Sequence, residues 1–181
     1  MPKYAILRDL PLTLTRTELD GMAMEGLVAA DLYPLCRTQQ GNPGIEWVRT
    51  YWQPGSNWGL CLYEAPSAEE LWDFQRSCGM EAVEIREVTE QRSDVTCDAA
   101  GELSDAIAGS QLTAVEIPLN ADGENALAAS GTWIRTYSDS ERQTAIALYA
   151  TSDSEQAPSA AQDDSSIHLP VVEIAAAAYR S

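Results

Sequence analysis

The chain has 181 residues, of which 11 are basic and 28 acidic, so its formal net charge is −17 at pH 7. Hydrophobic residues make up 45% of the chain, which is enough to bury a core and argues against a disordered protein. The charge argues against binding to nucleic acid or an anionic membrane, and no run of about 18 apolar residues predicts a membrane span. The opening residues lack a secretory signal, because Arg8 and Asp9 interrupt the apolar run, so we expect a cytoplasmic protein.

The first half of the chain predicts the order strand, helix, strand, strand, helix, strand. Short apolar or alternating runs predict the strands, at residues 4–9, 45–52, 58–64 and 82–88. A capping box at residues 15–18 begins the first helix. Ser67, before two acidic residues, begins the second helix, which Gly79 ends. This order is typical of a ferredoxin-like βαββαβ domain.

A second copy of this pattern follows later in the chain. The segment Trp47-Val48-Arg49-Thr50-Tyr51 returns as Trp133-Ile134-Arg135-Thr136-Tyr137, and Tyr63 returns as Tyr149 at the same spacing. Matches in the same order indicate two copies of one module. The second copy is degenerate, with a short helix expected at residues 122–129 and a polar segment at 152–166. The expected division is a repeat at 1–90, a linker at 91–111 and a second repeat at 112–181.

Side chains alternate between the two faces of a strand, and this alternation predicts an aromatic face on each copy. Soluble monomers rarely expose so large an apolar patch. We therefore expect an α+β fold in which two ferredoxin-like (βαββαβ) repeats form an intrachain dimeric α/β barrel, so that the chain is a monomer with an internal pseudo-dimer. The residues of the first face are Trp47, Arg49, Tyr51, Cys61 and Tyr63, and those of the second are Trp133, Arg135, Tyr137 and Tyr149.

The two arginines of these faces predict a ligand site between the two sheets. A guanidinium buried without a partner costs several kcal/mol, so each arginine needs a carboxylate, water or an anionic ligand. Glu84 and Glu173 hold equivalent positions in the last strands and are the candidate carboxylates. A packed core in which Arg–Glu pairs satisfy one another is the alternative. The candidate ligand-binding residues are Arg49, Tyr51, Cys61, Tyr63, Glu84, Arg135, Tyr137, Tyr149 and Glu173.

Four motifs of the first copy carry a resemblance to a known family. They are Arg8-Asp9-Leu10-Pro11, Trp47-Val48-Arg49-Thr50-Tyr51, Cys61-Leu62-Tyr63-Glu64-Ala65-Pro66, and Gly79 followed by Ile85-Arg86-Glu87-Val88. In these the chain resembles, over about residues 3–90, a family of small bacterial ferredoxin-like domains typified by a nickel-responsive, nickel-binding protein. The resemblance implies a ferredoxin-like fold that assembles by sheet-to-sheet packing. Phe74 and Gln75 stand where the family often has a histidine.

Metal and enzyme motifs add little to this resemblance. The one histidine, His168, and the four cysteines show no metal-ligand spacing, and the thiols are expected to be reduced. No dinucleotide fingerprint, phosphate-binding loop, zinc-protease motif or nucleophile elbow occurs. We therefore expect a non-catalytic binding protein for a small molecule or a divalent metal such as nickel, with the ligand and any cofactor left open. Catalysis by groups between the sheets, such as Tyr63, Arg49 and Glu84, is a third hypothesis. The cysteines are Cys36, Cys61, Cys78 and Cys97.

The alternative function is an acidic scaffold or interaction protein with an inert packed core. The polar segment at residues 152–166 and the negative charge favour a protein partner over a ligand in this hypothesis. Its contact residues would be Trp52, Trp58 and Trp72.

Overall fold

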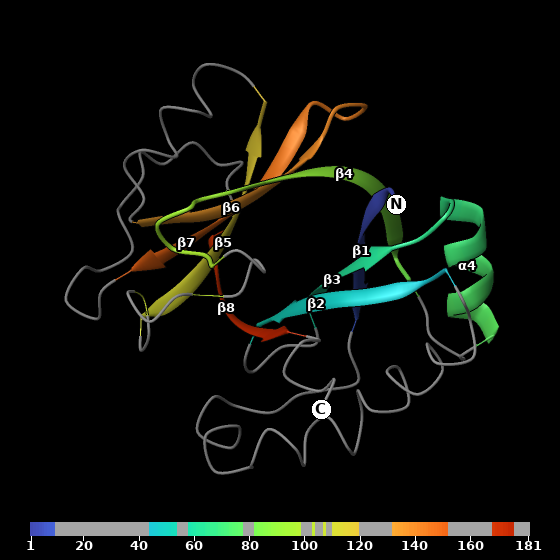
Figure 1. Ribbon diagram of the computed structural model, residues 1–181, viewed down its shortest axis with the longest axis horizontal. Coiled ribbons are helices and arrows are strands. Elements are labelled where there is room, and N and C mark those ends of the chain that lie inside the picture. Colours follow the sequence, from blue (N-terminus) through green and yellow to red (C-terminus); the bar gives the residue numbers. More distant parts are fainter. Residues whose placement is uncertain are drawn as a thin grey trace, which may run out of the picture. The chain divides into compact units, whose positions relative to one another are not determined.

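The computed structural model describes residues 1–9, 44–53, 58–77, 82–98, 103, 107, 110–119, 132–151 and 168–175. These residues contain eight strands and one α-helix, which Figure 1 shows as β1 to β8 and α4. They divide into two compact units: Met1–Glu87 with Glu173–Ser181, and Val88–Val172.

The first unit contains an antiparallel sheet of three strands. They are β1 (Lys3–Asp9), β2 (Glu46–Trp52) and β3 (Trp58–Glu64), and β3 pairs with both of the others. All five central residues of β3 are buried. Such continuous burial is typical of a strand that is covered on both faces.

Helix α4 (Ala68–Ser77) follows β3 after a short connection. The hydroxyl oxygen of Ser67 accepts a hydrogen bond from the backbone N–H of Glu70 at 3.1 Å, so it caps the first turn. Glu69 and Glu70 add negative charge near the N-terminus of the helix, and Arg76 adds positive charge in its last turn. The helix predicted to begin at Ser67 is therefore confirmed.

The buried side of α4 packs on the sheet of the first unit. Leu71, Phe74 and Gln75 are its buried residues, at the spacing of one helix face. The ring of Phe74 meets the ring of Tyr63 edge to face, with centroids 6.4 Å apart. In Figure 1 the helix runs beside the strands of this unit. The face of the sheet that carries Tyr63 is thus the one that α4 covers.

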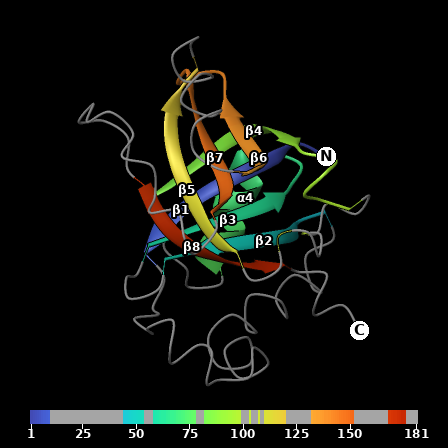
Figure 2. The same cartoon turned by 90° about the vertical axis from the view of Figure 1, so that its left-hand side faces the viewer.

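The second unit contains an antiparallel sheet, in which the described strands follow the order β4, β6, β7, β5, β8. Strand β4 joins it through Thr89–Arg92 and β8 through His168–Val171. Figure 2 shows β5, β7 and β6 running side by side. The bounds of the strands are β4 (Glu84–Arg92), β5 (Gln111–Pro118), β6 (Thr132–Asp139), β7 (Thr144–Thr151) and β8 (His168–Ala175).

The expected fold class, two ferredoxin-like (βαββαβ) repeats forming an intrachain dimeric α/β barrel, is wrong. The described residues hold antiparallel strands and the single helix α4. The segment expected to complete the first repeat, β4, pairs through Thr89–Arg92 with β6, inside the second unit. Alternation in the sequence predicts a strand but not the neighbour that satisfies its backbone hydrogen bonds. The tandem repeat is likewise not supported.

Individual strands were predicted more successfully than their arrangement. The strands expected at 4–9, 45–52 and 58–64 correspond to β1, β2 and β3, whereas β4 begins at Glu84 and continues to Arg92. The three-part division of the chain stays a prediction. No helix in the described ranges is long and apolar enough to span a membrane. Outside the described residues lie the first predicted helix, the predicted helix at 122–129 and the polar segment at 152–166.

Candidate functional site

A β-bulge interrupts each of the two strands that carry the candidate arginines. In β2 the pairing with β3 shifts register between Trp47 and Arg49. In β6 the pairing with β7 shifts between Trp133 and Arg135. The extra residue of a bulge reverses the alternation of the side chains that follow it. Each arginine therefore lies on the opposite face of its sheet from the tryptophan two positions before it.

In the first unit, the bulge divides the predicted aromatic face into two. Trp47 lies opposite Tyr63 and Thr50 lies opposite Cys61, so these four residues share the face covered by α4, here named the helix face. Because residues directly opposite one another share a face in an antiparallel pair, Arg49 belongs to the other face.

The second face of the first unit is here named the arginine face. Arg49 lies opposite Leu62, and Tyr51 lies opposite Leu60. All four of these residues are buried. The arginine face thus combines one cation with apolar and aromatic neighbours, whereas Cys61 and Tyr63 lie on the helix face and were wrongly assigned to the same face as Arg49.

The second unit shows the same separation. Trp133 lies opposite Tyr149, and both belong to an apolar cluster. Arg135 lies opposite Leu148 and Tyr137 opposite Ile146, so they occupy the other face of this sheet. The prediction that Arg135, Tyr137 and Tyr149 share one face is therefore wrong. The buried members of the cluster are Val115, Ile117, Ala145, Ala147 and Tyr149.

A hydrogen bond between two side chains spans each bulge, and neither bond was predicted. The indole Nε1 of Trp47 donates to Oγ1 of Thr50 at 3.0 Å, and Oγ1 of Thr50 donates to Sγ of Cys61 at 3.1 Å. In β6, Nε1 of Trp133 donates to Oγ1 of Thr136 at 2.9 Å. The sequence does contain a signal for these bonds. A threonine follows the tryptophan by three residues in both strands, and a buried indole N–H requires an acceptor.

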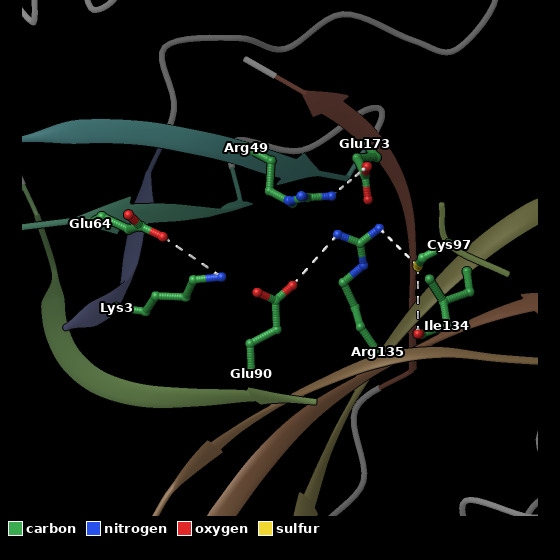
Figure 3. A network of polar contacts seen from close by, with 8 residues as sticks. All are labelled: Lys3, Arg49, Glu64, Glu90, Cys97, Ile134, Arg135 and Glu173. Atoms are coloured by element: carbon green, nitrogen blue, oxygen red, sulfur yellow. Dashed lines mark hydrogen bonds and ion pairs between the residues drawn. The ribbon is translucent and has the colours of Figure 1, made fainter. Parts of the chain in front are cut away.

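Arg49 forms a buried ion pair at the arginine face. Its Nη1 donates to Oε1 of Glu173 at 3.1 Å, and the two side chains are 4% and 5% exposed (Figure 3). Tyr51, two residues further along β2, is also buried. Of the two candidate carboxylates, Glu173 is thus the one that the structure brings to a candidate arginine. Arg49, Tyr51 and Glu173 are here named the Arg49 site.

The other candidate carboxylate, Glu84, lies with a different arginine. Its Oε2 accepts a hydrogen bond from Nε of Arg86 at 2.7 Å. Arg135 instead forms an ion pair with Glu90, whose Oε1 is 3.8 Å from its Nη1 (Figure 3). Glu84 and Glu90 are six residues apart in β4, so their side chains point to the same face of a regular strand. A strand predicted to continue beyond Val88 would therefore have made Glu90 a candidate too. The strand was predicted to end at Val88, so Glu90 was not among the candidates.

Tyr149 is a buried phenol in an apolar setting. Its hydroxyl has no hydrogen-bond partner among the described residues, and burial raises its pKa well above the usual value of 10.0. Burial also raises the pKa of Tyr4, with the negative charge of Glu87 as a second cause. Both tyrosines therefore stay neutral at any pH near 7.

The raised pKa of Tyr149 predicts a loss of stability at alkaline pH. Because the pKa of Tyr149 is higher in the folded chain than in the unfolded chain, the full free energy of unfolding is present below about pH 10. Above that pH the unfolded chain loses the proton first, and the free energy of unfolding falls by about 1.4 kcal/mol per pH unit. Urea unfolding should show this fall, and Y149F should make it shallower by that slope. The pKa of Tyr4 is raised as well, so Y149F should still lose some stability at alkaline pH. Equal slopes in both proteins would exclude this assignment.

Metal binding has little support from the described side chains. No group of three or more His, Cys, Asp or Glu residues that could hold a metal ion occurs among them. Transition-metal sites need three or four convergent donors. The backbone of His168 lies in β8, opposite Val115 of β5.

Comparisons with known proteins agree with the resemblance of the N-terminal part. Residues 4–88 match the model of a family described as nickel responsive protein SCO4226-like. A solved structure titled "Crystal structure study of anthrone oxidase-like protein" is similar, with 15% sequence identity over 97% of this chain and 93% of that chain and a TM-score of 0.41. A likeness this weak carries no argument about function. No curated protein matches the chain.

Proposed function

We propose that this chain is a non-catalytic binding protein for small organic anions, and that Arg49 anchors the anion. The supporting observation is the guanidinium of Arg49, which is buried and held by the carboxylate of Glu173 at 3.1 Å. A guanidinium recognises any carboxylate through the same N–H donors. A ligand carboxylate could therefore take the place of Glu173 at the Arg49 site.

The neighbours of Arg49 favour an anion with an apolar body. Tyr51 shares its face, and Leu60 and Leu62 lie opposite these two residues on β3. Small-molecule sites typically combine apolar and aromatic walls with a few polar groups that fix orientation. An aromatic or branched carboxylate fits this combination better than a fully hydrated inorganic anion does.

The charge at the Arg49 site favours an anion over a metal ion. A buried guanidinium repels a cation, and Glu173 is already engaged by that guanidinium. Nickel remains a second candidate because the family that matches residues 4–88 is described as nickel responsive. The scaffold alternative loses one of its three expected contact residues, because Trp52 is fully buried.

Calorimetric titration and thermal unfolding with benzoate, acetate, nickel chloride and magnesium chloride would test the proposal. Benzoate should bind and raise the melting temperature of the native chain. R49K should weaken benzoate binding about tenfold, because it keeps the charge but loses the planar donor pair. E173Q should strengthen it, because the competing carboxylate is gone. Nickel binding with no response to benzoate would favour the second candidate.

R76Q is the matched control for removal of an arginine. Arg76 is 70% exposed and pairs with Asp73 on the surface of α4, so its loss should leave benzoate binding unchanged. Melting temperatures without ligand show whether each variant folds. The anion proposal is wrong if neither the native chain nor E173Q binds benzoate, or if R49K binds it as tightly as R76Q does.

A further inference from the structure

The second unit contains a buried phenol that lacks a hydrogen-bond partner. Tyr149 of β7 is 1% exposed, and no group among the described residues bonds its hydroxyl. A hydroxyl that leaves water without gaining a partner costs free energy, so buried hydroxyls nearly always bond to the protein, to water or to a ligand. The hydroxyl of Tyr149 is therefore able to bond a molecule from outside the chain.

The indole next to Tyr149 already has its own hydrogen-bond partner. Trp133 lies opposite Tyr149, and Thr136 lies opposite Ala147, so all four residues share one face of the second sheet. Nε1 of Trp133 donates to Oγ1 of Thr136 at 2.9 Å. Trp133 and Thr136 thus satisfy one another, which leaves the phenol hydroxyl available for a ligand on this face.

The side chains around this phenol are apolar, and those on its own strand are small. Ala145 and Ala147 precede Tyr149 at alternate positions of β7, so all three residues share a face. Val115 of β5 lies opposite Ala147 and belongs to the same buried cluster, and Trp133 packs against that cluster. Figure 2 shows β7 running between β5 and β6. Apolar walls with one orienting polar group are typical of small-molecule sites.

The protonation of Tyr149 decides which kind of ligand fits. Burial raises the pKa of its phenol well above the usual value, so the hydroxyl keeps its proton near neutral pH and acts as a donor. The described members of the surrounding cluster carry no charge. A charged ligand would lose its hydration there without gaining a counter-ion, whereas a neutral carbonyl compound would lose little and accept the hydrogen bond.

We propose that Tyr149 anchors a neutral, largely apolar ligand by donating a hydrogen bond to its carbonyl oxygen. The body of the ligand lies against Trp133 and the two alanines of β7. This site belongs to the second unit, whereas the Arg49 site belongs to the first and holds an anion through a cation. The two sites therefore differ in both place and chemistry.

Titration of the full-length chain with acetophenone and with α-methylstyrene tests the proposal. The two molecules have nearly the same shape, but a methylene group in the second replaces the carbonyl oxygen of the first. Acetophenone should bind the native chain, and Y149F should weaken this binding about fivefold, because one hydrogen bond is lost. The affinity for α-methylstyrene should change by less than about twofold in Y149F, because this molecule accepts no such bond.

Y4F is the matched control for removal of a tyrosine hydroxyl. Tyr4 is also buried, but it belongs to the first unit and its hydroxyl is hydrogen-bonded to the backbone of Ala68. Y4F should therefore bind acetophenone as tightly as the native chain does. R49K should do so as well, which separates this result from the benzoate experiment.

Melting temperatures without ligand show whether Y149F folds. If it does not, the carbonyl stretching band of acetophenone bound to the native chain decides the question, because a hydrogen bond lowers its frequency below that in an apolar solvent. The proposal is overturned if the native chain does not bind acetophenone, if the band shows no such shift, or if a folded Y149F binds acetophenone as tightly as Y4F does. An equal loss of both molecules in Y149F would also overturn it, because the ring and not the hydroxyl would then hold them.

Discussion

Replacing Arg49 with methionine is expected to lower the free energy of unfolding by about 3–5 kcal/mol. The loss arises because Glu173, whose side chain is 5% exposed, would keep a negative charge after its guanidinium partner is removed. The double variant R49M/E173M should recover most of this loss, since apolar side chains of similar volume can replace a buried ion pair at little net cost. Urea unfolding of the four proteins at pH 7 gives the coupling energy.

The control for this cycle is a surface arginine. R76M removes an arginine that is 70% exposed, and such a change should alter the free energy of unfolding by less than about 0.5 kcal/mol. A double variant that is no more stable than R49M would show that the carboxylate of Glu173 is not the reason for the loss. In that case the arginine would contribute chiefly through the packing of its stem.

This cycle also separates the stability of the Arg49 site from its proposed ligand binding. A purely structural ion pair would show a large coupling energy and no response to benzoate. A ligand anchor would show the same coupling, and E173Q would bind the anion more tightly than the native chain. The structural and functional hypotheses therefore make different predictions for one residue, Glu173, whose removal destabilises the protein in both.

Local structure was predictable wherever one short segment contains the whole signal. The strands β1, β2 and β3 follow from apolar and alternating runs, because burial of one or both strand faces imposes those patterns. The start of α4 follows from Ser67, whose hydroxyl can reach the backbone of Glu70 in any chain that turns into a helix there. In each case the interaction joins residues close in sequence.

The face of the sheet on which each side chain lies was not predictable, because the one extra residue of the bulge decides it. Strict alternation places Trp47 and Arg49 together, and the bulge between them reverses this assignment. The corresponding bulge in β6 separates Trp133 from Arg135. A register shift depends on how both strands satisfy their backbone hydrogen bonds, which the sequence of one strand does not contain. The expected aromatic face failed at this step.

The partners of the buried arginines were predictable only in part. The expectation that each would need a carboxylate, water or an anionic ligand follows from the cost of burying a charge, and each of the two has a carboxylate partner. The equivalent positions of Glu84 and Glu173 made both candidates, but the carboxylate described beside Arg135 is that of Glu90, because β4 extends past Val88 and brings this residue within 3.8 Å of it. The end of β4, which a sequence pattern predicts poorly, therefore decides whether Glu90 is recognised as the partner of Arg135.

Replacing Phe74 with alanine is expected to lower the free energy of unfolding by about 3–5 kcal/mol, because the ring is buried and its loss leaves a cavity between α4 and the sheet. Thermal or urea unfolding measures the change. V83A is the control, since Val83 is 69% exposed and its truncation leaves no cavity. A loss below about 1 kcal/mol for F74A would mean that the helix does not pack through this ring.

The same variant tests which face of the sheet α4 covers. A double-mutant cycle of F74A with Y63L should give a coupling of about 0.5–1.5 kcal/mol, because the two rings meet edge to face. A cycle of F74A with Y51L should be additive within about 0.5 kcal/mol, since Tyr51 belongs to the arginine face. Uninterrupted alternation would instead place Tyr51 and Tyr63 together and couple both to Phe74. Only a bulge before Arg49 makes one tyrosine respond to the helix while the other does not.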